Sequence, residues 1–184
     1  MLINKIDQSG ASASGDIVAG DKNVYQVSLP PSRIEQLMER LAHEIETKAE
    51  IRETIEQLQF FHNKVNVDDV VGLEAKLTKA GRDSELYLAL AKKEQFAKLL
   101  EKYSLYSSAQ RIFAYILAKA EHQFNSVIYP QIACQDIPSV NILVTERIVD
   151  PLVSECGIGP IDITHSIVMG MIYWLADQCF VRWH

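Results

Sequence analysis

The sequence predicts a mainly α fold, a multi-helix bundle with a small N-terminal β arm that pairs between chains or with a partner. Residues 32–103 are dense in Lys and Glu, and their apolar residues recur every three or four positions, as in amphipathic helices. Residues 104–184 are apolar with few charges, which indicates helices of the core. Residues 1–28 combine Gly, Ser, Ala, Asn and Asp with isolated Ile and Val, which is typical of short strands and tight turns.

The chain therefore divides into an assembly or docking arm, residues 1–28, and a helical domain, residues 29–184. Its 184 residues suit one compact domain with a small appendage. With 48% hydrophobic and 23% charged residues, the composition excludes collagen-like, disordered and disulfide-scaffold classes. Because 24 acidic residues oppose 18 basic ones, giving a net charge of -6, we expect no direct binding to nucleic acid.

The charge-rich half contains the first expected helices. Ser32 follows a double proline, and its hydroxyl suits the N-cap of a helix. An apolar stripe runs through residues 34–58 at helical spacing, which predicts either one long helix or an antiparallel pair. A shorter helix is expected to end at Gly81, and another is expected over residues 84–103.

The apolar half is predicted to be helical around two prolines. A helix begins at Ser107 and is ended or kinked by Pro130, because proline lacks the backbone N–H that a helix needs. The next helix is expected to be capped by Ser139 and bent at Pro151.

The last expected helix begins at Asp162 or Thr164 and is apolar on nearly all sides, so it should lie at the centre of the bundle. Its apolar stretch, within residues 163–176, is too short to span a bilayer, and we expect no membrane contact. Residues 179–184 are expected to form a short strand or an extended tail.

The arm has too few expected strands to be stable alone, so it should pair with copies from other chains or with a partner's sheet edge. The residues assigned to this assembly arm are Gly15, Asp16, Ile17, Val18, Gly20, Asp21 and Lys22. Their pattern is close to a phosphate-binding P-loop, but Asp21 places a negative charge where the phosphate would lie. The strand-like residues that follow do not supply the helix N-terminus of such a loop.

Catalytic and metal-binding patterns are weak throughout the chain. Cys134, Cys156 and Cys179 are widely spaced, and no paired ligands such as C-x-x-C or H-x-x-x-H occur. Reduced cysteines in a cytoplasmic protein explain this number and spacing. His165 is an isolated histidine at the start of an apolar helix. We predict no catalytic residue, no metal ligand and no cofactor.

The densest aromatic group lies near the C-terminus. It comprises Tyr173, Trp174, Phe180 and Trp183. Aromatic residues dominate both cores and interfaces, so this group is either core packing or a surface that binds a partner.

Four stretches carry a resemblance to a known family. The opening SGASASGDIVAGDKN is similar to the Gly-Asp-x-x-x-Gly-Asp-Lys arm that precedes many bacterial conflict-system modules. The ending, GMIYWL through CFVRW, resembles the closing segment of C-terminal domains of ABC-three-component systems, as do VVGLEAKL and SSAQRIFAYILAKAE in the middle. This resemblance implies an operon with an SMC-like ABC ATPase and a small middle component that defends bacteria against phages or plasmids. It supplies no catalytic residues.

The leading hypothesis is a non-catalytic interaction and oligomerisation subunit of such a system. It would couple the ATPase or the middle component to an effector, and its arm would form a homo-oligomer. Two alternatives stay open. The arm could signal by amyloid-like β stacking, because it has low charge and β-branched residues. The chain could also be a hydrolase that uses His165 or a cysteine.

Overall fold

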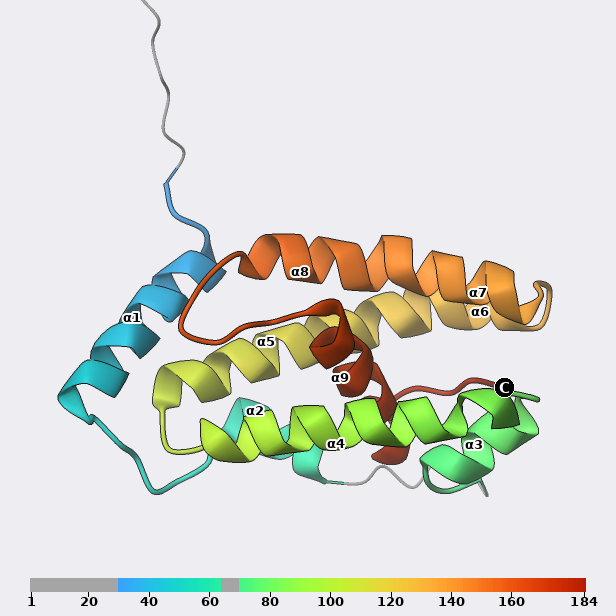
Figure 1. The fold of residues 1–184 in the computed structure, drawn as a ribbon, viewed down its shortest axis with the longest axis horizontal. Coiled ribbons are helices and arrows are strands. Elements are labelled where there is room, and N and C mark those ends of the chain that lie inside the picture. The colour runs from blue at the N-terminus through green and yellow to red at the C-terminus, as the bar shows by residue number, and fades with distance from the viewer. Residues whose placement is uncertain (1–29, 64–69) are drawn as a thin grey trace, which may run out of the picture. The chain divides into compact units, whose positions relative to one another are not determined.

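The computed structural model describes residues 30–63 and 70–184. The chain divides into two compact units, Met1–Pro30 and Pro31–His184, and the second unit is described here. Its elements, in chain order, are α1 (Arg33–Thr47), α2 (Glu56–His62), α3 (Leu73–Lys79), the 3₁₀ turn η1 (Asp83–Glu85), α4 (Leu86–Lys102), α5 (Ser107–Gln123), the π-helical turn η2 (Phe124–Ile128), α6 (Tyr129–Ile132), α7 (Ile137–Val144), the π-helical turn η3 (Thr145–Val149), α8 (Asp150–Cys156) and α9 (His165–Asp177). Figure 1 shows their arrangement.

The prediction of a mainly helical domain is confirmed. Residues 30–63 and 70–184 contain no strand, so the short C-terminal strand that was one of the two expectations for residues 179–184 is wrong. Cys179 adopts a left-handed backbone conformation directly after α9, with φ 68°, which turns the chain out of its helix. The N-terminal β arm, with Gly15 to Lys22, lies outside the described residues, and its predicted strands have no support here.

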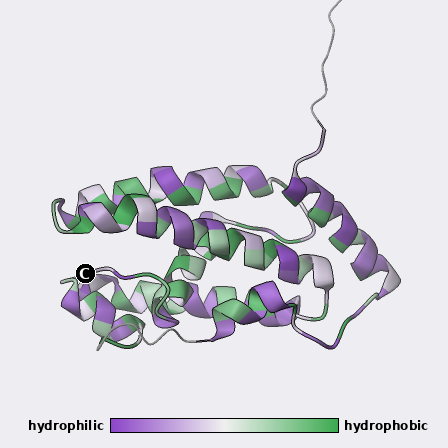
Figure 2. Ribbon diagram, turned by 180° about the vertical axis from the view of Figure 1, so that it is seen from behind, coloured by the Kyte–Doolittle hydropathy of each residue, from purple (hydrophilic) through white to green (hydrophobic). Residues whose placement is uncertain are grey.

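Helix α9 lies at the centre of the bundle, as its sequence predicts. It packs most closely on α4 and also contacts α5, α3 and α8. Every residue from Gly170 to Ala176 is buried, so the helix has no solvent-facing side over two turns. The N-cap is Thr164, whose hydroxyl accepts a hydrogen bond from the Ile167 N–H at 3.4 Å. Figure 2 shows hydrophobic residues concentrated where the helices face one another.

Pro130 was expected to end or kink its helix, and Pro151 to bend the next one. Neither Pro130 nor Pro151 ends its helix: each follows a π-helical turn, η2 or η3, and the helical path continues beyond it. A proline ring collides with the carbonyl four residues earlier in a regular α-helix, and the wider π turn gives it room. The result is a pair of long, interrupted helices, α5–η2–α6 and α7–η3–α8, that pack against each other.

Helix starts follow the sequence at some positions only. Ser32 forms a capping box with Glu35: each backbone N–H is bound by the other side chain. Asp136 rather than Ser139 caps α7, because the Asp136 carboxylate accepts the N–H of Ser139 at 2.8 Å. The apolar stripe over residues 34–58 is split between α1 and α2, since Lys48 turns left-handed, with φ 52°, and ends α1.

The C-terminal tail is held by two buried cations. Lys76 on α3 is 0% exposed, and its Nζ donates hydrogen bonds to the carbonyls of Ala176 at 2.5 Å and Val181 at 3.4 Å. The Arg82 guanidinium lies 4.6 Å from the centre of the Trp183 ring. Both contacts attach the last residues of the chain to α3 and η1, so the tail belongs to the core.

Candidate functional site

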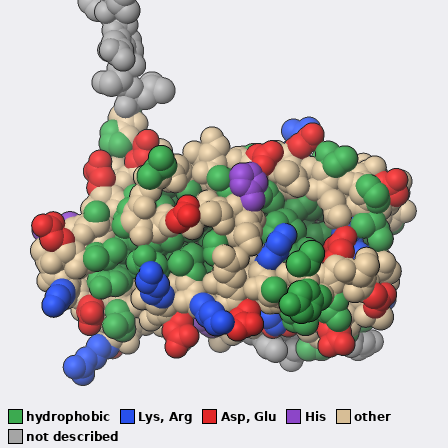
Figure 3. All heavy atoms as spheres, viewed as in Figure 1, with side chains coloured by type: hydrophobic (Ala, Val, Ile, Leu, Met, Phe, Trp, Pro, Cys, Tyr) green, Lys and Arg blue, Asp and Glu red, His purple; other side chains and the backbone are tan. Residues whose placement is uncertain are grey.

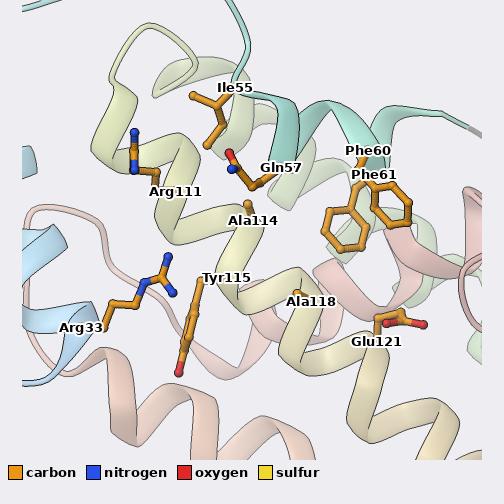
Figure 4. A pocket seen from close by; sticks show the side chains of 10 residues that line it. All are labelled: Arg33, Ile55, Gln57, Phe60, Phe61, Arg111, Ala114, Tyr115, Ala118 and Glu121. Carbon is orange, nitrogen blue, oxygen red and sulfur yellow. The ribbon is translucent and has the colours of Figure 1, made fainter.

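The candidate site is an open groove on the surface of α5, flanked by α1 and α2. Its cavity measures about 440 Å³. Figure 4 shows the side chains that line it, which are Arg33, Ile55, Gln57, Phe60, Phe61, Arg111, Ala114, Tyr115, Ala118 and Glu121. We call this hollow the α5 groove.

Helix α1 is positioned on one side of the groove by Glu44. Its carboxylate accepts hydrogen bonds from the Ser107 hydroxyl at 2.9 Å and from the N–H and hydroxyl of Ser108 at 3.0 and 2.8 Å. These groups form the first turn of α5, where unpaired N–H groups and the helix dipole favour an anion. Glu44 therefore caps α5 from a distant part of the chain and joins α1 to it.

Helix α2 is positioned on the other side by Gln110, which is 1% exposed. Its Oε1 accepts the N–H of Ile55 at 2.6 Å, and its Nε2 donates to the carbonyls of Glu53 at 3.2 Å and Ser104 at 2.5 Å. A buried amide with three bonds of this kind holds the connection before α2 in one place. The groove exists because α1 and α2 are both fixed to α5.

One end of the groove is apolar and aromatic. Phe61 is buried, whereas Phe60 beside it is 59% exposed. Their ring centres lie 5.1 Å apart, and Phe180 from the C-terminal tail lies 5.2 Å from Phe60 and 5.1 Å from Phe61. We call these three side chains the phenylalanine cluster. Ala114 and Ala118 form a low floor beside it because they lack long side chains.

The other end of the groove carries positive charge. In Figure 4, Arg33 from α1 and Arg111 from α5 lie at this end, away from the two phenylalanines. The Arg33 guanidinium lies 5.7 Å from the centre of the Tyr115 ring. Within residues 30–63 and 70–184 neither arginine forms a salt bridge with a carboxylate.

A hydrogen-bonded triad fixes Tyr115 in the groove. The Tyr115 hydroxyl donates to Glu155 on α8 at 2.6 Å, and the Lys119 Nζ donates to the other Glu155 oxygen at 2.5 Å. Burial alone would raise the pKa of Glu155, but the hydrogen bonds from Lys119 and Tyr115 outweigh it and hold this pKa below its usual value. The bond to Glu155 also raises the pKa of Tyr115, so the hydroxyl stays protonated and keeps donating.

A second hollow continues the groove. Its volume is about 510 Å³, and Phe60 and Glu121 line both hollows. Asn125 donates to the Glu121 carboxylate at 2.6 Å and to the carbonyl of Phe180 at 3.1 Å, which fixes the boundary between them. The exposed surface is therefore elongated, from the arginine end past the phenylalanine cluster to the C-terminal tail.

The predicted aromatic group is divided by the structure. Tyr173, Trp174 and Trp183 are buried in the core of this chain. Burial raises the pKa of the Tyr173 hydroxyl to about 12. Phe180 is half-buried and belongs to the phenylalanine cluster at the groove. The predicted arm residues, Gly15 to Lys22, lie outside the described part of the chain.

Sequence reasoning missed most of the groove. Two adjacent phenylalanines at positions 60 and 61 were an available signal, since a short amphipathic helix buries only one of two neighbours. Arg33 and Arg111 gave no signal, because they are 78 positions apart and line one groove only through the packing of α1 on α5.

The residues considered for catalysis occupy separate surroundings. The His165 Nε2 lies 3.1 Å from an oxygen of Asp150 in an exposed pair, while the Ser166 hydroxyl binds Gln95 on α4 instead. Cys134 is exposed, whereas Cys156 and Cys179 are buried. Burial raises the pKa of the Cys156 thiol to about 11, so it is protonated at neutral pH. Among the described residues, no group of three His, Cys, Asp or Glu is placed to hold a metal ion.

A separate apolar surface lies on α4. The first turns of α4 carry exposed hydrophobic side chains, among them Tyr87 and Leu88, and Figure 3 shows this gathering on the face it presents. Lys, Arg, Asp and Glu are interspersed over the same face.

None of the helices that the structure describes has the length and apolar character to cross a membrane.

The fold and the groove together define an all-helical domain with an elongated surface groove that has one apolar and one basic end. Residues 72–183 match the family model of C-terminal domain 9 of the ABC-three component (ABC-3C) systems, and the chain belongs to this family. The matched range runs from the start of α3 to Trp183, so α1 and α2 lie before it. No curated protein and no solved structure matches the chain.

Proposed function

We propose that this chain is a non-enzymatic interaction subunit of an ABC-3C system with a defence role. In this proposal it couples an SMC-like ABC ATPase or the middle component of the system to an effector. The observation that carries the proposal is the α5 groove, an elongated open surface in a chain of this family. It has an exposed aromatic side chain at one end, and at the other two arginines that form no salt bridge within residues 30–63 and 70–184. Exposed aromatic residues and arginines are the side chains that most often dominate binding to partner proteins.

The remaining polar groups support a binding role over a catalytic one. Glu44 and Gln110 position helices, and the Glu155 triad joins α5 to α8. The His165 and Asp150 side chains are 63% and 55% exposed, so water screens their interaction. These groups are accounted for by the folding of the domain.

Co-expression with the SMC-like ABC ATPase and the middle component that the proposal assigns to the system tests it. We expect one of them to co-elute with the full chain in size-exclusion chromatography, and phage protection to survive His165→Ala and Cys134→Ala, whose side chains are both exposed. A catalytic role would be indicated if either substitution abolished protection while the complex still formed. Absence of any complex, with protection intact after deletion of the chain, would refute the proposal.

We also propose that residues 1–28 assemble copies of this chain by β pairing, on the basis of their composition. A variant lacking these residues is expected to run as a smaller particle than the full chain in light scattering. The same oligomer from both proteins would remove this role from the arm. Seeded fibre growth by the full chain would favour the amyloid-like alternative instead.

A further inference from the structure

The α5 groove has the chemistry to select its partner. Arg33 and Arg111 bring two positive charges to one end, and neither is paired with a carboxylate within the described residues. A guanidinium group binds a carboxylate through two parallel hydrogen bonds, which fixes orientation as well as charge. A carboxylate at this end would be attracted by both cations.

The opposite end selects apolar groups. Phe60 is 59% exposed although its ring contacts Phe61 and Phe180, so one face of an ordered aromatic cluster is open to solvent. Ala114 and Ala118 leave space beside this face. Covering an exposed aromatic surface that is already ordered gains hydrophobic free energy at a small entropic cost, since the rings need not be immobilised again.

The shape of the site favours a chain segment. The two hollows meet at Phe60 and Glu121, so the surface extends well beyond one compact small molecule. An extended or helical segment would place successive side chains along it. Glu121 lies toward the aromatic end of the α5 groove, and Asn125 donates a hydrogen bond to its carboxylate at 2.6 Å. Arg182 lines the second hollow, whereas Arg33 and Arg111 are the two arginines that line the α5 groove itself.

We propose that the α5 groove binds a short acidic–apolar segment of a partner protein of the system. Its apolar side chains cover the phenylalanine cluster, and its carboxylate pairs with Arg33 and Arg111. This inference rests on the proposed function and names the chemistry of the partner's docking segment. Arg33, Phe60 and Phe61 precede the matched range at residues 72–183, while Arg111 and Tyr115 lie within it. The groove therefore joins the family domain to the helices before it.

Binding of labelled peptides to the full chain tests the inference. Peptides of about 15 residues, tiled across the ATPase and the middle component of the proposed system, are measured by fluorescence anisotropy. We expect an acidic–apolar peptide to bind, and its binding to weaken about tenfold in Arg111→Glu and in Phe60→Ser. Replacing its Glu and Asp by Gln and Asn should cost a similar factor in the wild type and little further in Arg111→Glu. Added salt should weaken the native peptide more than the neutral one.

Matched controls separate this result from damage to the fold. Arg147→Glu reverses the charge of an exposed arginine on η3, and Leu88→Ser removes an apolar side chain that is also 59% exposed, on α4. Both controls should change the affinity by less than about twofold. All four variants should keep the helical circular dichroism signal and unfold cooperatively.

The outcomes distinguish this inference from the proposed function. If the complex with the ATPase or middle component forms but ignores Arg111→Glu and Phe60→Ser, the groove is not the docking site, although the interaction role stands. Equal binding of native and neutral peptides would overturn the role of the arginines. Self-association that Phe60→Ser abolishes would identify a second copy as the occupant, and binding of a peptide of residues 1–29 would identify the chain's own N-terminal segment. Either finding would overturn the proposal.

Discussion

Alanine at Gly170 is expected to destabilise the protein by about 3 kcal/mol, at the upper end of what overpacking costs. Gly170 lies in α9 where this helix crosses α4. A Cβ atom there would lie 2.2 Å from the Lys92 carbonyl oxygen, 2.9 Å from the Lys92 carbonyl carbon and 3.1 Å from the Phe96 Cβ. The first two atoms are backbone, so no change of rotamer relieves the collision. The two helices would have to separate along the most extensive helix–helix contact in the domain.

Thermal and urea unfolding of Gly170→Ala measure this cost. A loss of about 3 kcal/mol corresponds to a melting temperature lower by roughly 6–12 °C for a domain of this size. Gly159→Ala is the matched control: its Cβ would lie 2.9 Å from the Met38 Sδ, the end of a flexible side chain that can move. We expect the control to cost less than about 1 kcal/mol. Equal costs for the two variants would show that α4 and α9 pack less closely than described.

The helical architecture was predictable because its signals are local. Apolar spacing and the cap at Ser32 depend on neighbours within one or two turns, and the central position of α9 follows from its uniform apolarity. The end of α1 at Lys48 was not predictable in this way. No glycine or proline marks it. The left-handed turn is closed by a backbone hydrogen bond from the Ala49 N–H to the Glu44 carbonyl at 2.9 Å, and the chain after it is held by one from the Ile51 N–H to the distant Leu105 carbonyl at 2.7 Å.

At other helix ends too, a group from a distant part of the chain has the role that a neighbouring residue usually has. The first turn of α5 looks self-sufficient with its two serines, yet its anion comes from Glu44 on α1. The effect of Pro130 depends on whether the helix can widen into a π turn, which the proline itself does not specify. The sequence therefore predicted where the helices lie along the chain, but not the contacts that join them or the π turns that continue them past a proline.

The candidate site was less predictable than the fold. The aromatic group near the C-terminus was found from sequence, but burial depends on what packs against each ring. Trp174 lies against Phe96 of α4, at 5.8 Å between ring centres, whereas Phe180 meets the exposed Phe60. These partners are 78 and 120 positions away. No periodicity within one segment carries information about such contacts.

Trp183→Ala is expected to cost about 3–5 kcal/mol, the usual range for removing a fully buried large aromatic side chain. Trp183 is 1% exposed although it is the penultimate residue of the sequence. Its ring packs edge-on against Phe124 at 4.9 Å and lies 6.0 Å from Tyr173, while the Arg82 guanidinium covers it at 4.6 Å. Alanine would leave a cavity, and the buried Arg82 guanidinium would lose the aromatic ring against which it packs.

Two control substitutions in the same tail make this expectation specific. Trp183→Phe should cost less than half as much, because it keeps an aromatic ring and removes an indole N–H that has no hydrogen-bond partner within the described residues. Phe180→Ala should cost about 1–2 kcal/mol, since this ring is half-buried at the α5 groove. Urea unfolding of the three variants ranks them. If Trp183→Ala proved no more costly than Phe180→Ala, the tail would be an appendage on the surface. With the expected order the tail is part of the core, and this explains how it places Phe180 against Phe60.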